Sequence, residues 1–528
     1  MPLSRSAHLD TFTRDHLPPA DQWPVFRFTL PELHYPERLN CAVSLLDDTI
    51  TRYGPDRPCL HSDTTTWSYA ELAVRSNQLA HVLVDDLGLV PGNRVLLRAP
   101  NTPWLVAAWL ATLRAGCVVV TTVPQLRPAE LRTVGEIARI DHSLVDDRYA
   151  ADLAAADIAP MSAQSELTER AATKDTTFPA CDTAADDVAL LAFTSGTTGR
   201  PKATMHFHRD VLANADTFAR HVLRPLPDDL YAGSPPLGFT FGLGGLVVFP
   251  LYAGAATLMI EKPSPDALLS AVVERGATGL FTAPTAYRAM VGALPAGGMR
   301  GLRRCVSAGE PLPRATWQAF HEATGVRIID GIGATEMLHI FVSAAGDDIR
   351  PGATGRAVPG YTATVLDEDG GEAPDDTVGR LAVRGPTGCR YLADPRQTDY
   401  VQRGWNITGD SYVRDRDGYL WYQARSDDMI ISSGYNIAGP EVEQALLEHP
   451  DVVEAGVVGT PDPARTMSVV GYVVLRPGAT VGEDDLKAFC KARIAPYKCP
   501  RAVVFVEALP RTSTGKLMRH ELRARATR

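Results

Sequence analysis

The sequence lacks the features that mark secreted, zinc-binding and nucleic-acid-binding proteins. Its eight cysteines form no C-x-x-C pair and no Cys/His spacing typical of zinc. Residues 1–19 contain no apolar core of a secretion signal. The net charge of −10 disfavours a broad electrostatic grip on nucleic acid. We therefore expect a cytoplasmic protein with reduced, mostly buried thiols and no nucleic-acid partner.

Long uncharged runs are also scarce, with one exception at residues 231–260. This stretch is long enough to span a membrane. However, Pro235, Pro236 and Pro250 interrupt it, and proline breaks a helix interior. We predict a buried loop, helix and strand here and no membrane association, with a membrane helix as the weaker alternative.

The chain of 528 residues is too long for one compact core and indicates several packed lobes. Helical periodicity repeatedly precedes a strand-like run, which predicts an α/β fold with parallel sheets covered by helices. The pairs are residues 69–86 with 94–98, 104–115 with 117–123, and 265–275 with 278–284.

The pattern of predicted strands and helices changes near residue 427. Short strands and closely spaced turns precede it, and a compact β/α unit with helices at 441–449 and 483–493 follows. We predict an N-terminal domain at 1–426 and a C-terminal domain at 427–528, a normal domain size of about 100 residues.

The most informative segment is TSGTTGRPK, at residues 194–202, which follows an apolar strand at 188–193. Its glycines let backbone N–H groups approach an anion, while hydroxyls and a lysine add donors and positive charge, as a polyphosphate requires. The spacing is not that of a Walker A loop, and a turn without ligand is the weaker alternative. The predicted phosphate-binding residues are Thr194, Ser195, Gly196, Thr197, Thr198, Gly199 and Lys202.

This loop resembles the signature loop of the adenylate-forming superfamily, which includes acyl-CoA ligases, adenylation domains and luciferases. The family activates a carboxylate as an acyl-AMP. Further matches follow in the family's order over roughly residues 40–525. The resemblance implies a large multi-lobed N-terminal domain of parallel sheets with helices plus a small β-barrel, a small mobile α+β C-terminal domain, and ATP, Mg²⁺ and coenzyme A as cofactor or substrate.

Residues 331–336 (GIGATE) resemble the second core motif of the family. The resemblance implies that Glu336 holds Mg²⁺ between the ATP phosphates and that Thr335 donates to the α-phosphate. In isolation a Thr-Glu pair is more often a helix N-cap with an acidic first turn. The other implied adenine and nucleotide contacts are Ser307, Ala308, Gly309, Glu310, Asp330, Gly331 and Ile332.

The TGD motif at residues 408–410 and the following strand resemble the ribose site of the family. Asp410 would accept hydrogen bonds from the ribose hydroxyls, Arg425 would reach the same sugar, and Tyr422 would lie against the nucleoside. The plain alternative is an exposed acid–base pair. Ala424 stands where relatives usually carry glycine, a small departure.

The resemblance also implies two reactions at one site. Asp427 matches the hinge, and Lys516, after a Ser-Thr-Gly run, matches the lysine that neutralises charge on the carboxylate and α-phosphate. The C-terminal domain would then rotate and bring up Ser433, Gly434 and Tyr435, which would line the tunnel for the pantetheine thiol. An exposed tail lysine is the alternative for Lys516.

The nearer resemblance is to benzoate-type CoA ligases, above all 2-aminobenzoate–CoA ligases, carried by residues 238–245, 282–290, 330–341, 386–395 and 433–440. It implies an aryl pocket lined by Phe239, Thr240, Phe241, Ala283, Gly333, His339 and Ile340, with glycine leaving slot width for a flat ring. The Thr240 hydroxyl is a candidate partner for an ortho amino or hydroxyl group; a hydroxyl bonded to nearby backbone is an equal alternative. His339 is either a pocket residue or a buried structural histidine.

We therefore expect ATP-dependent activation of an aromatic acid, 2-aminobenzoate or a close ortho-substituted benzoate such as salicylate, through aryl-AMP to aryl-CoA. One alternative is a stand-alone enzyme that loads the phosphopantetheine of a carrier protein. The other is an inactive nucleotide-binding protein, which the presence of Lys516, Glu336 and Asp410 disfavours. The oligomeric state stays open, a homodimer included.

Overall fold

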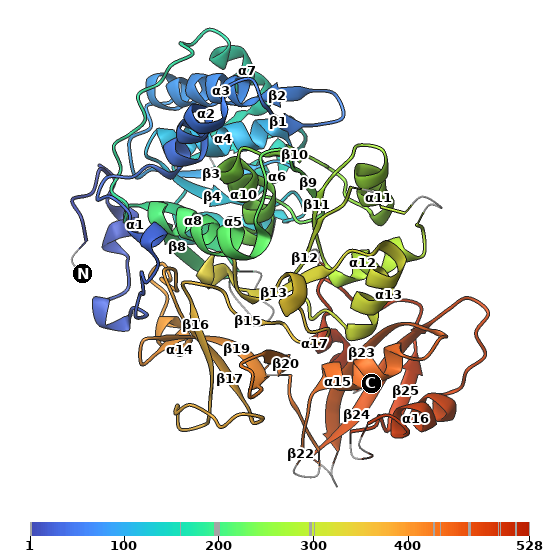
Figure 1. Ribbon diagram of the computed structural model, residues 1–528. Coiled ribbons are helices and arrows are strands. Elements are labelled where there is room, and N and C mark those ends of the chain that lie inside the picture. Colours follow the sequence, from blue (N-terminus) through green and yellow to red (C-terminus); the bar gives the residue numbers. More distant parts are fainter. Residues whose placement is uncertain are drawn as a thin grey trace.

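The computed structural model describes residues 3–158, 160–194, 201–294, 298–299, 301–425, 428–432, 435–462, 466–494, 496, 498–512 and 515–526. The strands of these residues form four sheets (Figure 1). Two large sheets with helices come first in the chain, an antiparallel sheet follows, and a fourth sheet with its own helices forms the C-terminal part.

The six-stranded sheet has the order β6-β5-β3-β4-β7-β8, and its neighbours are parallel except β7 and β8. Its strands are β3 (Arg94–Arg98), β4 (Val118–Thr121), β5 (His142–Val145), β6 (Met161–Ala163), β7 (Val188–Phe193) and β8 (Ala203–Phe207). The helices of this part are α3 (Tyr69–His81), α4 (Pro103–Arg114), α5 (Pro128–Ala138), α6 (Ala150–Ala155) and α7 (Gln164–Ala171).

Local chemistry sets where α3 and α4 begin. The Ser68 hydroxyl accepts from the Glu71 N–H at 3.2 Å, and the Glu71 carboxylate accepts from the Ser68 N–H at 2.7 Å, which completes a capping box. Thr102 caps α4 by accepting from the Leu105 N–H at 3.3 Å, and Pro103 occupies the first turn, where its missing N–H has no cost.

The nine-stranded sheet has the order β15-β14-β13-β12-β11-β9-β10-β1-β2, parallel from β13 to β1 and antiparallel at both ends. Its strands are β1 (Pro58–His61), β2 (Thr66–Ser68), β9 (Leu230–Gly233), β10 (Ala256–Leu258), β11 (Gly279–Thr282), β12 (Arg304–Ser307), β13 (Ile328–Gly333), β14 (Ile340–Ser343) and β15 (Arg356–Ala357). Its helices are α2 (Asp48–Tyr53), α8 (His208–Asn214), α9 (Thr240–Leu243), α10 (Phe249–Ala253), α11 (Pro265–Val273), α12 (Pro284–Val291) and α13 (Arg314–Thr324), with π-helical turns η6 (Ala215–Leu223) and η7 (Gly244–Val248).

The uncharged stretch at 231–260 folds as the end of β9, then α9, η7, α10 and β10. Most of it is buried, and most of its apolar residues belong to the main hydrophobic core, while Ala232 and Leu258 belong to a second core cluster. The prediction of a buried loop, helix and strand is therefore confirmed. No helix in the described part of the chain is long and apolar enough to cross a membrane.

The third sheet is antiparallel throughout and stands where the small β-barrel is expected. Its order is β16-β17-β19-β18, and β20 pairs with the other half of β19. Its elements are β16 (Thr362–Leu366), β17 (Val378–Arg384), α14 (Gln397–Tyr400), β18 (Val401–Gln402), β19 (Trp405–Arg414) and β20 (Leu420–Arg425).

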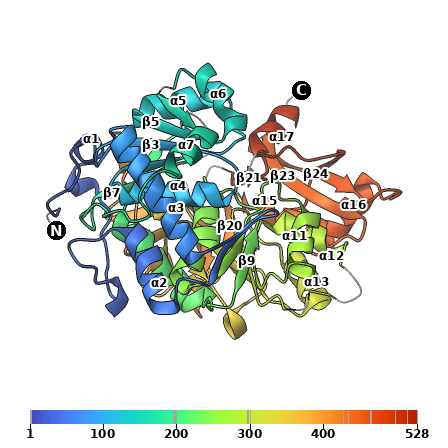
Figure 2. The ribbon, with the colours of Figure 1, turned by 90° about the horizontal axis from the view of Figure 1, so that it is seen from above.

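The C-terminal lobe contains a five-stranded sheet in the order β22-β21-β24-β23, with β25 parallel to β24. Its elements are β21 (Ile430–Ser432), β22 (Tyr435–Ile437), α15 (Gly439–Leu447), β23 (Val452–Asp462), β24 (Thr466–Leu475), α16 (Glu483–Lys491), β25 (Ala502–Phe505) and α17 (Arg519–Ala526). In Figures 1 and 2 this lobe lies beside α12, α13 and β20, and α15 packs on α13 and β20. The predicted domain boundary at 426 and 427 falls outside the described residues.

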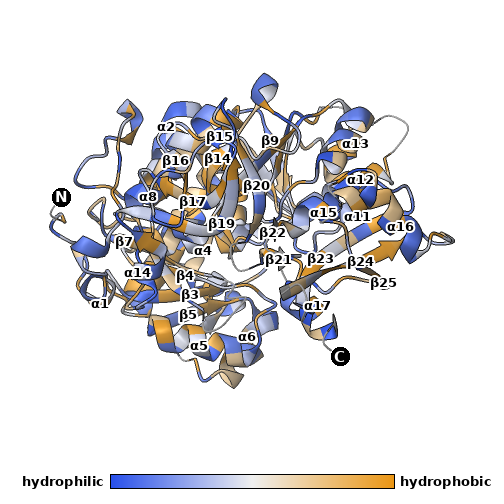
Figure 3. Cartoon of the chain, turned by 90° about the horizontal axis from the view of Figure 1, so that it is seen from below, coloured by the Kyte–Doolittle hydropathy of each residue, from blue (hydrophilic) through white to orange (hydrophobic). Residues whose placement is uncertain are grey.

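Hydrophobic residues gather on the strands, whereas helices such as α5 and α16 carry both characters (Figure 3). All eight cysteines are free, and all but Cys181 are buried, as the sequence predicts. The α/β architecture with a large N-terminal part and a small α+β C-terminal lobe is confirmed.

Candidate active site

The predicted phosphate loop is closed at its base by two backbone contacts. The Thr194 N–H donates to the Lys202 carbonyl at 3.0 Å, and the Lys202 N–H donates to the Thr194 hydroxyl at 3.3 Å. These bonds end the β7–β8 pairing and leave residues 195–200 as the connection. Ser195, Gly196, Thr197, Thr198 and Gly199 lie outside the described residues, so their phosphate contacts stay a prediction.

The side chain of Lys202 meets Glu336 across a tyrosine that sequence reasoning missed. The Lys202 ammonium donates to the Tyr391 hydroxyl at 2.6 Å, and that hydroxyl donates to Glu336 Oε1. Lys202 Nζ lies 3.7 Å from the same oxygen and 4.5 Å from the Tyr391 ring centroid. Burial raises the pKa of Tyr391, so the phenol remains a donor. The segment around Tyr391 carried the resemblance, but no spacing linked it to the phosphate loop.

A neutral histidine on β8 donates a hydrogen bond to the backbone of Thr335. His206 Nε2 donates to the Thr335 carbonyl at 2.8 Å. Burial lowers the pKa of His206 to about 3, so the imidazole is uncharged and can act as a simple donor. This contact fixes the chain where β13 ends and the short 3₁₀ turn with Glu336 begins.

Glu336 could provide one ligand of a magnesium ion whose other ligands are substrate phosphates and water. Glu336 is 6 % exposed, and of its two carboxylate oxygens Oε1 alone accepts a hydrogen bond from a described residue. In the described part of the chain, no three His, Cys, Asp or Glu side chains group to hold a metal by themselves. One carboxylate fits Mg²⁺, which is usually bound through one or two carboxylates plus substrate phosphates and water.

The predicted adenine residues meet at the ends of neighbouring parallel strands. Ser307 closes β12 and pairs in register with Asp330 of β13. The Ser307 hydroxyl and Asp330 Oδ1 have no hydrogen-bond partner among the described residues. Burial raises the pKa of Asp330 to about 8, and Gly309 has a positive φ of 88° that favours glycine. The structure thus brings Ser307–Glu310 and Asp330–Ile332 together at a place where α/β sheets bind ligands.

Asp410 and Arg425, the predicted ribose pair, face each other across β19 and β20. Arg425 Nη1 lies 3.3 Å from Asp410 Oδ1 and donates to the Thr408 carbonyl at 3.1 Å. Gly409 has a φ of 76°, which favours glycine, and a Cβ there would lie 2.8 Å from Arg425 Nη2, so a larger residue would displace the guanidinium. Burial raises the pKa of Asp410, and the Arg425 charge opposes this shift. The predicted Tyr422 ring packs edge-on against Tyr412.

Lys516 sits in a tight turn of the C-terminal lobe. Its N–H donates to the Thr512 hydroxyl at 3.1 Å, and the Thr512 N–H donates to its carbonyl at 2.8 Å. The Lys516 side chain is exposed. Burial raises the pKa values of Glu310 and Asp410, and the Lys516 charge is among the groups that oppose both shifts. The Lys516 charge therefore acts on Glu310 and Asp410, two residues of the N-terminal part.

Phe239, Thr240 and Phe241 of the predicted aryl pocket enter and begin α9. Thr240 is half-buried, and its hydroxyl makes no hydrogen bond with a described residue. The backbone-bonded alternative for this threonine is therefore not what the structure has. Phe241 packs near Phe281, with ring centroids 5.6 Å apart.

His339 stands in a cage of aromatic rings. The ring centroids of Phe218, Phe241 and Phe249 lie 5.3, 5.7 and 4.6 Å from the imidazole. Burial lowers the pKa of His339 to about 3. The Phe241 carbonyl faces the ring, yet neither ring nitrogen completes a hydrogen bond with a described residue. A buried neutral imidazole with unused nitrogens is available to a polar group of a ligand.

Three further residues of the predicted aryl pocket also have a structural role, in strand packing or at the start of a helix. A Cβ on Gly333 would lie 2.7 Å from the His339 carbonyl, so glycine here lets β14 approach β13, a reason other than slot width. Ile340 is 1 % exposed and covers Gly331. Ala283 caps α12.

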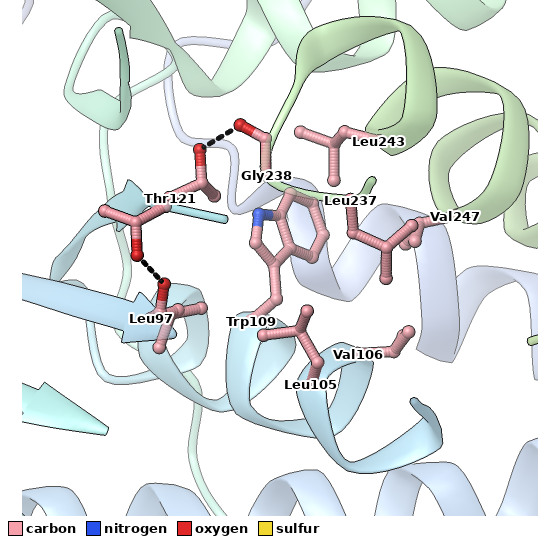
Figure 4. Close-up of a pocket in the computed structure, with 10 residues that line it drawn as sticks. Leu97, Leu105, Val106, Trp109, Thr121, Leu237, Gly238, Leu243 and Val247 are labelled. Atoms are coloured by element: carbon pink, nitrogen blue, oxygen red, sulfur yellow. Dashed lines mark hydrogen bonds between the residues drawn. The ribbon is translucent and has the colours of Figure 1, made fainter. Parts of the chain in front are cut away.

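A small pocket lies behind the α9 loop, between α4 and the ends of β3 and β4 (Figure 4). Its cavity volume of about 10 Å³ has room for one water molecule and not for an aromatic acid. The buried Trp109 indole N–H has no hydrogen-bond partner among the described residues, whereas the Thr121 hydroxyl donates to the Gly238 carbonyl at 2.9 Å.

The predicted hinge residue and most of the predicted tunnel residues lie outside the described part of the chain. Asp427, Ser433 and Gly434 lie outside the described residues, and Tyr435 begins β22 without a described side chain. The hinge and the pantetheine tunnel therefore stay predictions.

Residues 46–391 match the family of AMP-binding enzymes, and residues 441–516 match the C-terminal domain of AMP-binding enzymes. The chain belongs to the AMP-binding enzyme family. The matched ranges of this AMP-binding enzyme include the phosphate loop, Glu336, Tyr391 and Lys516, whereas Asp410 and Arg425 lie between them.

Several similar proteins are named as CoA ligases of aromatic acids. The AMP-binding enzyme is 34 % identical to the benzoate–CoA ligase of Thauera aromatica, over 94 % of this chain and 98 % of the relative. The solved anthranilate CoA ligase AuaEII with anthranoyl-AMP superposes with a TM-score of 0.88 at 30 % identity, covering 94 % and 99 % of the two chains. A benzoate CoA ligase from Burkholderia xenovorans LB400 gives a TM-score of 0.85 at 33 % identity, covering 92 % and 100 %.

Proposed function

We propose that this enzyme activates an aromatic carboxylic acid with ATP and transfers the acyl group to coenzyme A. The enzyme is an acid–thiol ligase that forms AMP and pyrophosphate. The meeting of Lys202 and Glu336 through the Tyr391 hydroxyl supports this proposal above all. The relatives named benzoate and anthranilate CoA ligases support the same class.

In the first half-reaction, a carboxylate oxygen of the acid attacks the α-phosphorus of ATP. The bond to pyrophosphate breaks, and an acyl-AMP forms. Lys202 holds the phosphates, Asp410 and Arg425 hold the ribose, and Lys516 neutralises negative charge that grows on the α-phosphate. Glu336 would hold a magnesium ion, which would supply positive charge to the phosphates of ATP.

In the second half-reaction, the coenzyme A thiolate attacks the acyl carbon, and AMP leaves with the bonding electrons. The thioester keeps part of the free energy of ATP cleavage. An enclosed site protects the mixed anhydride from water during the interval.

The acid that fits best is a benzoate with a polar ortho group, such as 2-aminobenzoate or 2-hydroxybenzoate. The phenylalanines around His339 suit a flat aromatic ring. The Thr240 hydroxyl and the nitrogens of His339, which have no hydrogen-bond partner among the described residues, are the polar groups that can meet an amino or hydroxyl substituent. Apolar pockets separate close analogues by only about 10–200-fold, so we expect plain benzoate to react more slowly.

The test is pyrophosphate release with ATP, Mg²⁺ and a panel of benzoate, 2-aminobenzoate, 2-hydroxybenzoate, 3-hydroxybenzoate and a medium-chain fatty acid. We expect aromatic acids to lead and an ortho-substituted one to rank first. No release with any acid contradicts the proposed activity, and preference for the fatty acid contradicts the aryl pocket.

Thr240→Ala tests the ortho contact. We expect the ratio of kcat/KM for 2-aminobenzoate over benzoate to fall about 5–10-fold, because a hydrogen bond of about 1 kcal/mol is lost for one substrate only. Phe239→Leu is a control that trims the neighbouring side chain without touching a hydroxyl. An unchanged ratio in Thr240→Ala removes this residue from substrate choice.

The alternative acceptor is a carrier protein, whose phosphopantetheine arm has the same thiol as coenzyme A. Mass spectrometry of products formed with coenzyme A and with a holo carrier protein separates the two. We expect acyl-CoA; acylation of the carrier alone reassigns the acceptor while leaving the first half-reaction intact.

A further inference from the structure

Arg511 lies between a carboxylate of its own lobe and a carboxylate of the N-terminal part. Its Nη1 donates to Glu310 Oε1 at 2.9 Å, and its Nη2 donates to Glu454 Oε2 at 2.9 Å. Glu454 lies on β23 of the C-terminal lobe, whereas Glu310 follows β12 in the predicted adenine loop. One guanidinium therefore ties the lobe to the loop beside the nucleotide.

The same guanidinium also shapes the turn that carries Lys516. Arg511 Nη1 donates to the Gly515 carbonyl at 2.7 Å, and the backbones of Arg511 and Leu517 pair across the turn. Moving Arg511 therefore moves Lys516, which follows Gly515 directly. The contact with Glu310 fixes the direction in which this turn faces.

The ion pair between Arg511 and Glu310 is partly shielded from solvent. The side chains of Arg511 and Glu310 are 26 % and 15 % exposed, so the ion pair is screened less than one on the open surface. Burial raises the pKa of Glu310, and Arg511 is the strongest opposing charge, ahead of Lys516 and Arg288. Its two oriented N–H groups suit two carboxylates at once, which a lysine cannot match.

We propose that Arg511 is a positioning residue: by pairing with Glu310 it docks the C-terminal lobe with Lys516 facing the nucleotide, for acyl-AMP formation alone. Glu454 travels with Arg511, so that pair persists when the lobes separate, while the Glu310 pair is made and broken in each cycle. This inference rests on the proposed two-step reaction.

The first experiment compares the half-reactions in Arg511→Gln. We expect pyrophosphate release to slow about tenfold, equivalent to ~1.4 kcal/mol, while thioester formation from supplied aryl-AMP and coenzyme A keeps its rate. Arg511→Lys retains the positive charge but lacks the forked guanidinium. It should therefore recover part of the lost rate of pyrophosphate release. Equal slowing of both half-reactions overturns the inference, because a merely structural role damages both.

The second experiment is a double-mutant cycle between Arg511→Gln and Glu310→Gln, measured on pyrophosphate release at saturating ATP. Coupled partners give a double variant no slower than the slower single variant. Glu454→Gln is the matched control, since its partner stays within one lobe; we expect no selective loss of the first half-reaction. Additive effects of Arg511 and Glu310, or selective loss in Glu454→Gln, overturn the inference.

Failure of this inference is distinguishable from failure of the proposed function. If the wild-type enzyme releases no pyrophosphate with any acid, the ligase assignment is wrong. If it does so and the variants slow both halves together, only the role of Arg511 is wrong.

Discussion

At the scale of single residues, the chemistry of the site depends on side chains that share hydrogen bonds over long sequence distances. Tyr391 connects Lys202 and Glu336, which would otherwise be a bare lysine–carboxylate pair 3.7 Å apart. The hydroxyl engages one carboxylate oxygen and leaves the other for a metal. We expect this arrangement to set how readily Glu336 accepts magnesium.

Tyr391→Phe tests that expectation. Without the hydroxyl, Glu336 loses its donor and the lysine draws it away, so we expect the apparent affinity for Mg²⁺ to fall about 10–100-fold. The measurement is binding of a fluorescent ATP analogue titrated with Mg²⁺, alongside turnover.

Tyr400→Phe is the matched control for this prediction. The Tyr400 hydroxyl is buried without a hydrogen-bond partner among the described residues, and its ring packs 5.9 Å from that of Tyr391. We expect Mg²⁺ binding in this variant to match the wild type. A shift of equal size in both variants argues against a role for the Tyr391 hydroxyl.

At the scale of elements, the sequence predicts some of the strands and helices and misses others, such as β12 and β13, which carry the predicted adenine residues. The strand at 94–98 coincides with β3, and the helix at 265–275 contains α11. The pattern at 69–86 is one helix in sequence, but the structure ends α3 at His81 and continues as a π-helical turn. No helix is predicted at 519–526, where α17 forms, because this charged segment has no clear apolar period.

Gly333→Ala probes how closely β13 and β14 must approach. The added Cβ meets backbone at 2.7 Å, and backbone cannot rotate aside, so we expect about 1–3 kcal/mol of lost stability and weaker ATP binding. Chemical denaturation measures the first effect. Gly292→Ala is the control, since its Cβ would meet a single atom at 3.7 Å. Wild-type stability in Gly333→Ala shows that the strands can part without cost.

At the scale of the whole molecule, the site is an interface between lobes. Arg511 of the C-terminal lobe pairs with Glu310, which follows β12 of the nine-stranded sheet, and Lys516 lies in the same turn as Arg511. We propose that the lobes are the domains 1–426 and 427–528, with a hinge at Asp427. One arrangement of the C-terminal lobe serves acyl-AMP formation, and a second arrangement must admit the thiol of coenzyme A.

Lys516→Ala tests domain alternation. We expect pyrophosphate release to fall about 10²–10³-fold, because one electrostatic contact to the developing charge is removed. Thioester formation from supplied aryl-AMP should continue, since the lysine is withdrawn in that step. Lys498→Ala, which removes a lysine of the same lobe paired with Glu441, serves as the control. Loss of both half-reactions in Lys516→Ala refutes alternation.

The sequence by itself determined the α/β class, the family and the types of chemical group that the site contains. It could do so because glycine-rich turns, apolar periods and motif residues are local properties of the chain. Only the tertiary structure decided which groups meet: Tyr391 with Lys202 and Glu336, and Arg511 with Glu310. These contacts join residues 55 to 201 positions apart. No local pattern encodes such a pairing, because it depends on how whole sheets and lobes pack against each other.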